Sequence, residues 1–135
     1  MSADAMWQLQ KAVYSRLTGD SALMALVNNN IYENVPEETA FPFVAISDLE
    51  AVTQEQTEKN LYAVNFFIDC ITRERGSKKT LDIIKAAEDS LLGTSLSVTG
   101  YDVLNIRSAN SACKRMNDGI TYIGSLKIVS LLKQT

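Results

Sequence analysis

The sequence predicts an α+β domain in which an antiparallel or mixed β-sheet is packed by an N-terminal helix and a central helix and ends in a closing β-hairpin. Apolar residues recur at helical spacing near the N-terminus and again between residues 77 and 93. Residues 60–72 alternate at period two, and two strand-like stretches near the C-terminus flank a turn signature. A chain of 135 residues has the usual length of one domain, so we expect residues 1–135 to form a single domain.

Two helices are predicted before the first strand. The first covers residues 3–18, because apolar residues keep helical spacing up to Gly19, which can end a helix. Asp20 can cap a second, short helix, which is expected to end at the asparagines of residues 28–30, since asparagine tolerates the left-handed conformation. The apolar residues of the first helix are Met6, Leu9, Val13 and Leu17.

A loop with two prolines is predicted to lead into the first long strand. After an extended piece at residues 31–35, the loop contains Pro36 and Pro42, and the strand is expected at residues 41–52. Pro42 has no backbone N–H, so the beginning of this strand should lie at a sheet edge or at the first strand position. The prolines are expected to stiffen the loop in front of the sheet.

The strand at residues 60–72 shows the clearest alternation in the chain. One side is uniformly apolar and is predicted to face the core, namely Tyr62, Val64, Phe66, Ile68 and Cys70. The opposite side mixes apolar and polar residues, whereas a face in contact with water is usually plainly hydrophilic. Phe67 lies on this mixed side, which we expect to be covered by a partner.

A central helix and a final hairpin complete the predicted fold. Ser77 and Gly93 bound the helix, whose lysines near the beginning and acidic residues near the end oppose the helix dipole, so we expect these charges not to serve helix stability. Strands are predicted at residues 98–107 and 120–133, joined through the turn residues Asn117, Asp118 and Gly119. The polar residues 108–116 are expected to form the projecting tip of this hairpin.

The residue types needed for common catalytic and metal chemistry are scarce. The chain has no histidine, and its cysteines, Cys70 and Cys113, are far apart and are read as reduced thiols. Glu37 and Glu38 are the nearest approach to a carboxylate pair, but neighbours on a loop point in different directions. We therefore expect no catalytic residue, no metal and no cofactor, and we predict that the protein is not an enzyme.

Composition also bears on partners. The N-terminus lacks the features of a secretory signal, and no stretch approaches eighteen apolar residues, so no membrane segment is expected. The formal net charge is −3, which argues against tight binding of nucleic acid.

Charge is unevenly distributed along the chain. Residues 33–58 contain seven acidic residues and no lysine or arginine, whereas basic residues gather around the strand-to-helix turn and on the final hairpin. One interpretation is two solvated faces. The other is a head-to-tail interface in which the acidic segment of one subunit meets the basic turn of the next and closes a ring. The residues expected at this interface or at the tube are Glu37, Glu38, Glu50, Phe67, Arg73, Arg75, Lys78, Lys79, Lys114 and Arg115.

The order of these elements resembles the phage tail-completion family, also called tail terminators, found in tailed phages and gene transfer agents. The similarity covers nearly the whole chain, through the alternating strand AVNFFIDCIT, the helix TLDIIKAAEDSLLG and the closing ITYIGSLKIVSL. Members often carry Gly-Arg before the extended segment, where this chain has Asn29 and Asn30. The opening motif is carried by Leu17, Asp20, Leu23, Leu26, Ile31, Tyr32, Pro36, Pro42, Phe43 and Val44.

The resemblance implies a structural virion protein. Such a protein forms a hexameric ring that caps the major tail tube protein, ends its polymerisation and faces the head-tail connector protein, while DNA passes through the lumen without specific binding. It would be assembled in the host cytoplasm and reside in the virion tail or neck. The alternatives are a neck or head-completion connector, distinguished by gene position, and a monomeric module for a small ligand, which requires a pocket with converging polar groups.

Overall fold

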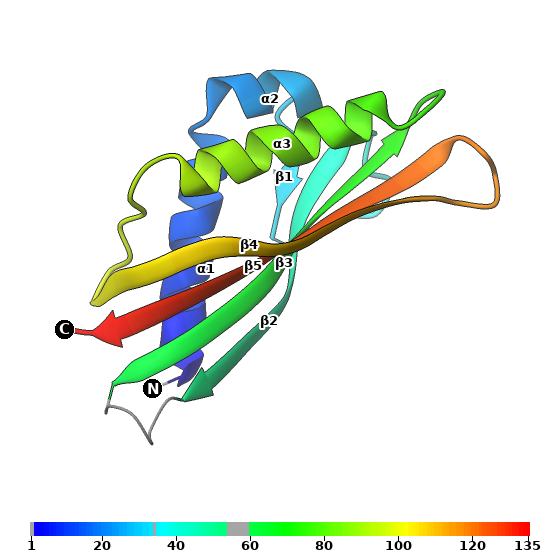
Figure 1. Ribbon diagram of the computed structural model, residues 1–135. Coiled ribbons are helices and arrows are strands. Elements are labelled where there is room, and N and C mark those ends of the chain that lie inside the picture. The colour runs from blue at the N-terminus through cyan, green and yellow to red at the C-terminus, as the bar shows by residue number, and fades with distance from the viewer. Residues whose placement is uncertain (1, 34, 54–59) are drawn as a thin grey trace.

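Five strands form one twisted sheet, and helices α1 and α3 pack on one of its faces (Figure 1). This computed structural model describes residues 2–33, 35–53 and 60–135. In chain order the elements are α1 (Ser2–Thr18), α2 (Ser21–Val27), β1 (Ile31–Tyr32), β2 (Phe43–Thr53), β3 (Leu61–Arg73), α3 (Lys78–Leu92), β4 (Tyr101–Arg115) and β5 (Thr121–Gln134). The predicted α+β class is confirmed.

The sheet has the strand order β1-β2-β3-β5-β4. The short β1 runs parallel to β2, and every other neighbouring pair is antiparallel, so the sheet is mixed. β3 lies at the centre, where its apolar side from Tyr62 to Cys70 is buried as the alternation predicted. The last two strands form the expected hairpin around the turn at Gly119, whose φ of 78° suits glycine.

The core lies between the helices and one face of the sheet. Leu9 and Leu17 of α1, Ile83 of α3 and Phe66 of β3 are all essentially inaccessible to solvent. α1 ends at Thr18 before Gly19, as predicted, and the second helix is capped by the Asp20 carboxylate, which accepts from the Leu23 N–H at 3.1 Å. The helices therefore bury their apolar stripes against the same face, and no helix in residues 2–33, 35–53 and 60–135 covers the opposite face (Figure 1).

The fourth strand is longer than predicted. The strand was expected to end at residue 107, before a projecting tip at residues 108–116, but β4 continues to Arg115 and pairs with β5 up to the Arg115–Tyr122 pair. Hydrogen bonding along the ladder does not require apolar side chains, so the hairpin persists after the hydrophobic alternation has ended. The expected projection is present, since the hairpin extends beyond the rest of the sheet (Figure 1).

The interpretation of the α3 charges was wrong for Lys78 and Asp89. Lys78 forms an ion pair with Asp82 at 2.7 Å, and Lys85 forms one with Asp89 at 2.8 Å. Both pairs join residues i and i+4 on the exposed side of the helix, a spacing that supports helices by a few tenths of a kcal/mol, roughly. These lysines and aspartates serve the helix after all.

Candidate assembly surface

The face of the sheet opposite the helices carries a mixture of apolar and polar side chains. Strand register places on it the residues that lie opposite each other across β2, β3 and β5, for example Phe43, Ile71 and Ile123 in one row. All three are only partly buried. The mixed side of β3 that the sequence indicated is therefore uncovered in the monomer, and Phe67 lies near its middle.

A carboxylate joins three strands on this open face. Asp69 of β3 accepts hydrogen bonds from the hydroxyl of Ser47 in β2 at 2.6 Å and from that of Ser125 in β5 at 3.0 Å. One row further along, the ammonium group of Lys127 lies 5.9 Å from the centre of the Phe67 ring. These contacts hold polar groups in fixed positions within a partly apolar surface. Such a mixture is typical of an interface that is solvated in the free subunit and buried in a complex.

The acidic loop that leads into β2 is held by side-chain hydrogen bonds. The Asn30 side-chain amide donates to the backbone carbonyls of Ala40 and Pro42 at 3.3 and 3.2 Å, and its side-chain oxygen Oδ1 accepts from the Tyr32 hydroxyl. Thr39 donates to the Pro36 carbonyl within the loop. The expected stiff loop thus has a physical basis beyond its prolines, and Asn30 anchors it.

Glu37 and Glu38 are exposed on this loop, and Glu50 is exposed on β2. Glu38 adopts a left-handed backbone conformation with φ of 56°. Two further acidic residues of the predicted acidic segment, Glu55 and Glu58, lie outside the described residues.

The basic turn lies at the same end of the sheet as the acidic loop. The Arg73 guanidinium stacks on the ring of Phe41, 4.3 Å from its centre, and its Nε donates to the Thr121 hydroxyl at 3.3 Å. Arg75 is exposed, Lys78 is paired within its helix and Lys79 is partly buried. Arg73 is thus engaged by its own chain, and the contact between the acidic loop and this turn across subunits stays a prediction.

The hairpin presents two more of the predicted residues. Lys114 and Arg115 are exposed at the far end of β4. The turn beyond them is closed by Asp118, which accepts from the N–H groups of Ile120 and Thr121 at 3.0 and 2.8 Å. Hydrogen bonds from Thr121 lower the pKa of the Asp118 carboxyl. The tip of the hairpin is therefore well ordered although it is fully exposed.

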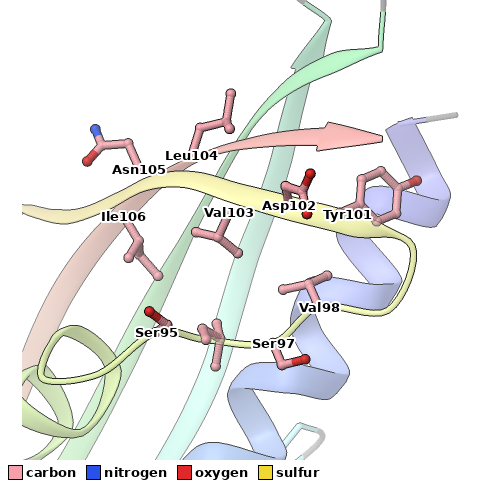
Figure 2. Close-up of a pocket in the computed structure, with 10 residues that line it drawn as sticks. Ser95, Ser97, Val98, Tyr101, Asp102, Val103, Leu104, Asn105 and Ile106 are labelled. Carbon is pink, nitrogen blue, oxygen red and sulfur yellow. The ribbon is translucent and has the colours of Figure 1, made fainter. Parts of the chain in front are cut away.

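A cavity of about 550 Å³ lies between β4 and the chain that precedes it (Figure 2). Val103 and Ile106 point from β4 toward the 95–98 segment, whereas Asp102 and Asn105 point away from it (Figure 2). Asp102 and Asn105, the polar residues of β4 that point away, thus do not converge into the cavity as the polar groups of a small-ligand site do.

Two observations bear on reactive chemistry. Burial raises the pKa of the Cys70 thiol to about 12, which leaves it protonated and unreactive at neutral pH. Within residues 2–33, 35–53 and 60–135, no group of three or more Cys, Asp or Glu side chains is placed to hold a metal ion.

Membrane insertion through a helix has no support in the described chain. None of its helices combines the length and the apolar character that crossing a bilayer demands.

The sequence did not indicate two of the structural contacts that shape this surface. The Asp69 bridge was invisible because Ser47 and Ser125 lie far from it in the chain and have no special pattern. Arg16 of α1 donates to the carbonyls of Ser90 and Ser95 at 2.8 and 2.7 Å, and so fixes the segment that lines the cavity. A lone arginine near the end of a helix gives no sign of such long-range partners.

These features together define a small α+β protein whose mixed sheet carries its helices on one face and leaves the other face open. A family model described as "Tail completion protein gp17" matches residues 11–130, and the chain belongs to this family of structural phage tail proteins. A comparison with curated protein sequences finds no match.

Solved structures resemble the chain in fold. One is a chain in the structure titled "Virion of native gene transfer agent (GTA) particle", with 21% identity, 93% of this chain and 94% of that chain covered, and a TM-score of 0.83. Another is the bacteriophage SPP1 gp17 protein, with 21% identity, 97% and 91% coverage, and a TM-score of 0.58. At this level of identity the likeness concerns the fold alone.

Proposed function

We propose that the protein forms a ring on the end of the tail tube, ends tube polymerisation and joins the tail to the head connector. The observation that carries the proposal is the sheet face that the chain's own helices leave uncovered, in a member of the tail completion family. A face with partly buried apolar side chains and fixed polar groups suits a contact with other protein subunits.

The partners follow from the same proposal. They are further copies of the chain, arranged as a hexamer, together with the major tail tube protein and the head-tail connector protein. The likeness to a chain of a gene transfer agent virion supports a place in the tail or neck of a particle, assembled in the host cytoplasm. The net charge of −3 suits a lumen through which DNA passes without being held.

Removing the gene tests the role in length control. We expect particles made without the protein to show overlong tails, with or without heads, in electron micrographs, and normal tails to be restored when the gene is supplied again. Tails of normal length that lack heads would instead favour the neck connector, and normal particles would refute both roles.

Charge reversal tests the predicted contact between the acidic loop and the basic turn. Arg73→Glu with Arg75→Glu should weaken ring formation, and Glu37→Lys with Glu38→Lys should partly restore it if the groups meet across subunits. Sedimentation of the purified variants reports assembly, and thermal unfolding separates this effect from the loss of the Arg73 stack on Phe41. Unchanged sedimentation of both variants would discard this pairing.

A further inference from the structure

Two long strands of the sheet have free edges. Within the described part of the chain, β4 has a strand neighbour only in β5, and β2 has its outer side covered by β1 only at Val44 and Ala45. The outer edge of β2 is thus open from residue 46 to its end. Exposed strand edges present rows of unpaired N–H and C=O groups and readily accept another strand.

The directions of these edges fit one another in a ring. β2 is antiparallel to β3, β3 to β5 and β5 to β4, so β4 runs antiparallel to β2 across the sheet. A rotation about an axis that lies roughly along the strands leaves strand direction unchanged. The β2 strand of a neighbouring copy would therefore meet β4 as an antiparallel partner and continue the pattern of the sheet.

Opposite charges occupy the two edges at the same height. Arg107 of β4 lies opposite Val129, Val129 lies opposite Asn65, and Asn65 lies opposite Glu50 of β2. Because directly opposite residues share a face, Arg107 and Glu50 lie on the same open face in one row. Both side chains are exposed, and neither belongs to the ion pairs found among residues 2–33, 35–53 and 60–135.

Apolar side chains and open space lie beside the same row. Val52 on β2 and Leu104 on β4 are 46% and 51% exposed, although large apolar side chains are normally buried. The cavity between β4 and the 95–98 segment leaves room next to the beginning of the β4 edge (Figure 2). A neighbouring copy whose β2 edge paired with this β4 edge would bring its Val52 close to Leu104.

The register shifts limit how far such pairing can run. β2 is irregular between Ser47 and Glu50, and β4 is irregular between Val103 and Asn105 and again between Ser108 and Asn110. The regular stretch of β4 that contains Arg107 is therefore short. Bulges at sheet edges oppose indiscriminate strand addition, which leaves a short stretch for a specific partner.

The geometry points to a seam between copies in which the β4 edge of one subunit pairs with the β2 edge of the next, with Arg107 facing Glu50. This inference rests on the proposed ring and names the surfaces that close it. It differs from the contact between acidic loop and basic turn, because the groups involved lie on opposite edges of the sheet, as a head-to-tail ring requires.

Engineered disulfides test the seam in assembled particles. The background is Cys113→Ser, since Cys113 is the exposed thiol and Cys70 is buried. Opposite residues in an antiparallel pair bring Cβ atoms to about 5 Å, a separation that a disulfide can bridge with small shifts. Glu50→Cys combined with Arg107→Cys should give covalent oligomers on a non-reducing gel after mild oxidation, and each single variant should give none.

The outcomes separate the seam from the proposed function. Absence of covalent oligomers in particles with tails of normal length would overturn the seam and leave the role in length control intact. Cross-linking of Glu50→Cys to Asn105→Cys or Asn110→Cys in place of Arg107→Cys would overturn the stated register. Normal tails in particles that lack the gene would refute the proposed function instead.

Charge reversal supplies a second readout. Arg107→Glu should lower the yield of completed particles by about tenfold, and the added change Glu50→Arg should recover most of it. Lys11→Glu makes the same charge change on the exposed side of α1, a helix that packs on the opposite face of the sheet from Arg107 and Glu50, and should leave the yield unaltered. An equal loss for Lys11→Glu, or no recovery in the double variant, would overturn the pairing.

Discussion

Gly124 determines how closely α3 approaches the sheet, and adding one methyl group there should destabilise the fold. Gly124 lies on the helix-facing side of β5, opposite Cys70 of β3. A Cβ atom at this position would lie 2.7 Å from Cγ2 of Thr80 and 3.0 and 3.2 Å from two carbon atoms of Ile84. These distances are shorter than normal contacts between carbon atoms, so α3 or its side chains must shift.

The neighbouring side chain has little freedom to move away. Thr80 is fully buried, and its hydroxyl lies 2.7 Å from that of Thr72, so rotating its methyl group aside breaks a buried hydrogen bond. Overpacking of this kind costs about 1–3 kcal/mol. The reduced freedom of alanine in the unfolded chain returns about 0.4–1 kcal/mol. We expect Gly124→Ala to lower the free energy of unfolding by about 1–2 kcal/mol.

Equilibrium unfolding in urea measures this effect, and a second substitution locates its cause. Thr80→Ser removes the methyl group that clashes and keeps the hydroxyl that bonds to Thr72. Alone it should cost about 0.8 kcal/mol for the lost buried methyl group, but in the Gly124→Ala background it should cost less or restore stability. Additive effects of the two substitutions, or a Gly124→Ala protein as stable as the wild type, would refute the reasoning.

Three further predictions concern stability and assembly. Burial and the hydrogen bond to Asp4 raise the pKa of Tyr101 to about 12. The neutral phenol should therefore contribute fully to the free energy of unfolding below about pH 10, and this contribution should decline toward pH 12. Urea unfolding of Tyr101→Phe over the same pH range should lack this decline. Arg16→Met should lower the free energy of unfolding by about 1–3 kcal/mol and speed amide exchange in residues 93–98, because the hydrogen bonds from Arg16 to Ser90 and Ser95 are lost. Unchanged exchange would show that these hydrogen bonds do not hold the segment. Phe67→Ser should keep the melting temperature within a few degrees and lower the yield of completed particles seen by electron microscopy, because Phe67 lies on the open face expected to contact a partner.

Sequence patterns could predict the helices and the central strand because burial on one face leaves a clear periodicity. α1, α3 and the buried side of β3 follow the spacing of their apolar residues. The end of β4 could not be predicted in this way, because that part of the hairpin is held by its ladder and all of its side chains from Ala109 to Arg115 are exposed. Backbone pairing without burial leaves no mark in the hydrophobic pattern.

For a related reason, only part of the candidate site could be predicted from the sequence. The mixed side of β3 and the separation of charges could be seen in the sequence, but the partners of each charge depend on strand order. The row that contains Glu50 and Arg107 exists because β5 lies between β3 and β4, and no local pattern specifies that order. Likewise, the sequence could not show that Arg73 stacks on Phe41, which precedes β2 and lies more than thirty residues earlier in the chain.

The open face has a mixed pattern of apolar and polar residues because, under the proposed function, it is exposed to water in the free subunit and buried in the assembly. The face must tolerate water in the free subunit, where Asp69 and Lys127 give it polar groups, and must release water in the ring, where Phe67 and Ile71 supply apolar area. A surface selected for both states is neither a plain core pattern nor a plain solvent pattern. The helices meet no such conflict, because they stabilise the subunit before assembly, and their pattern is correspondingly clear.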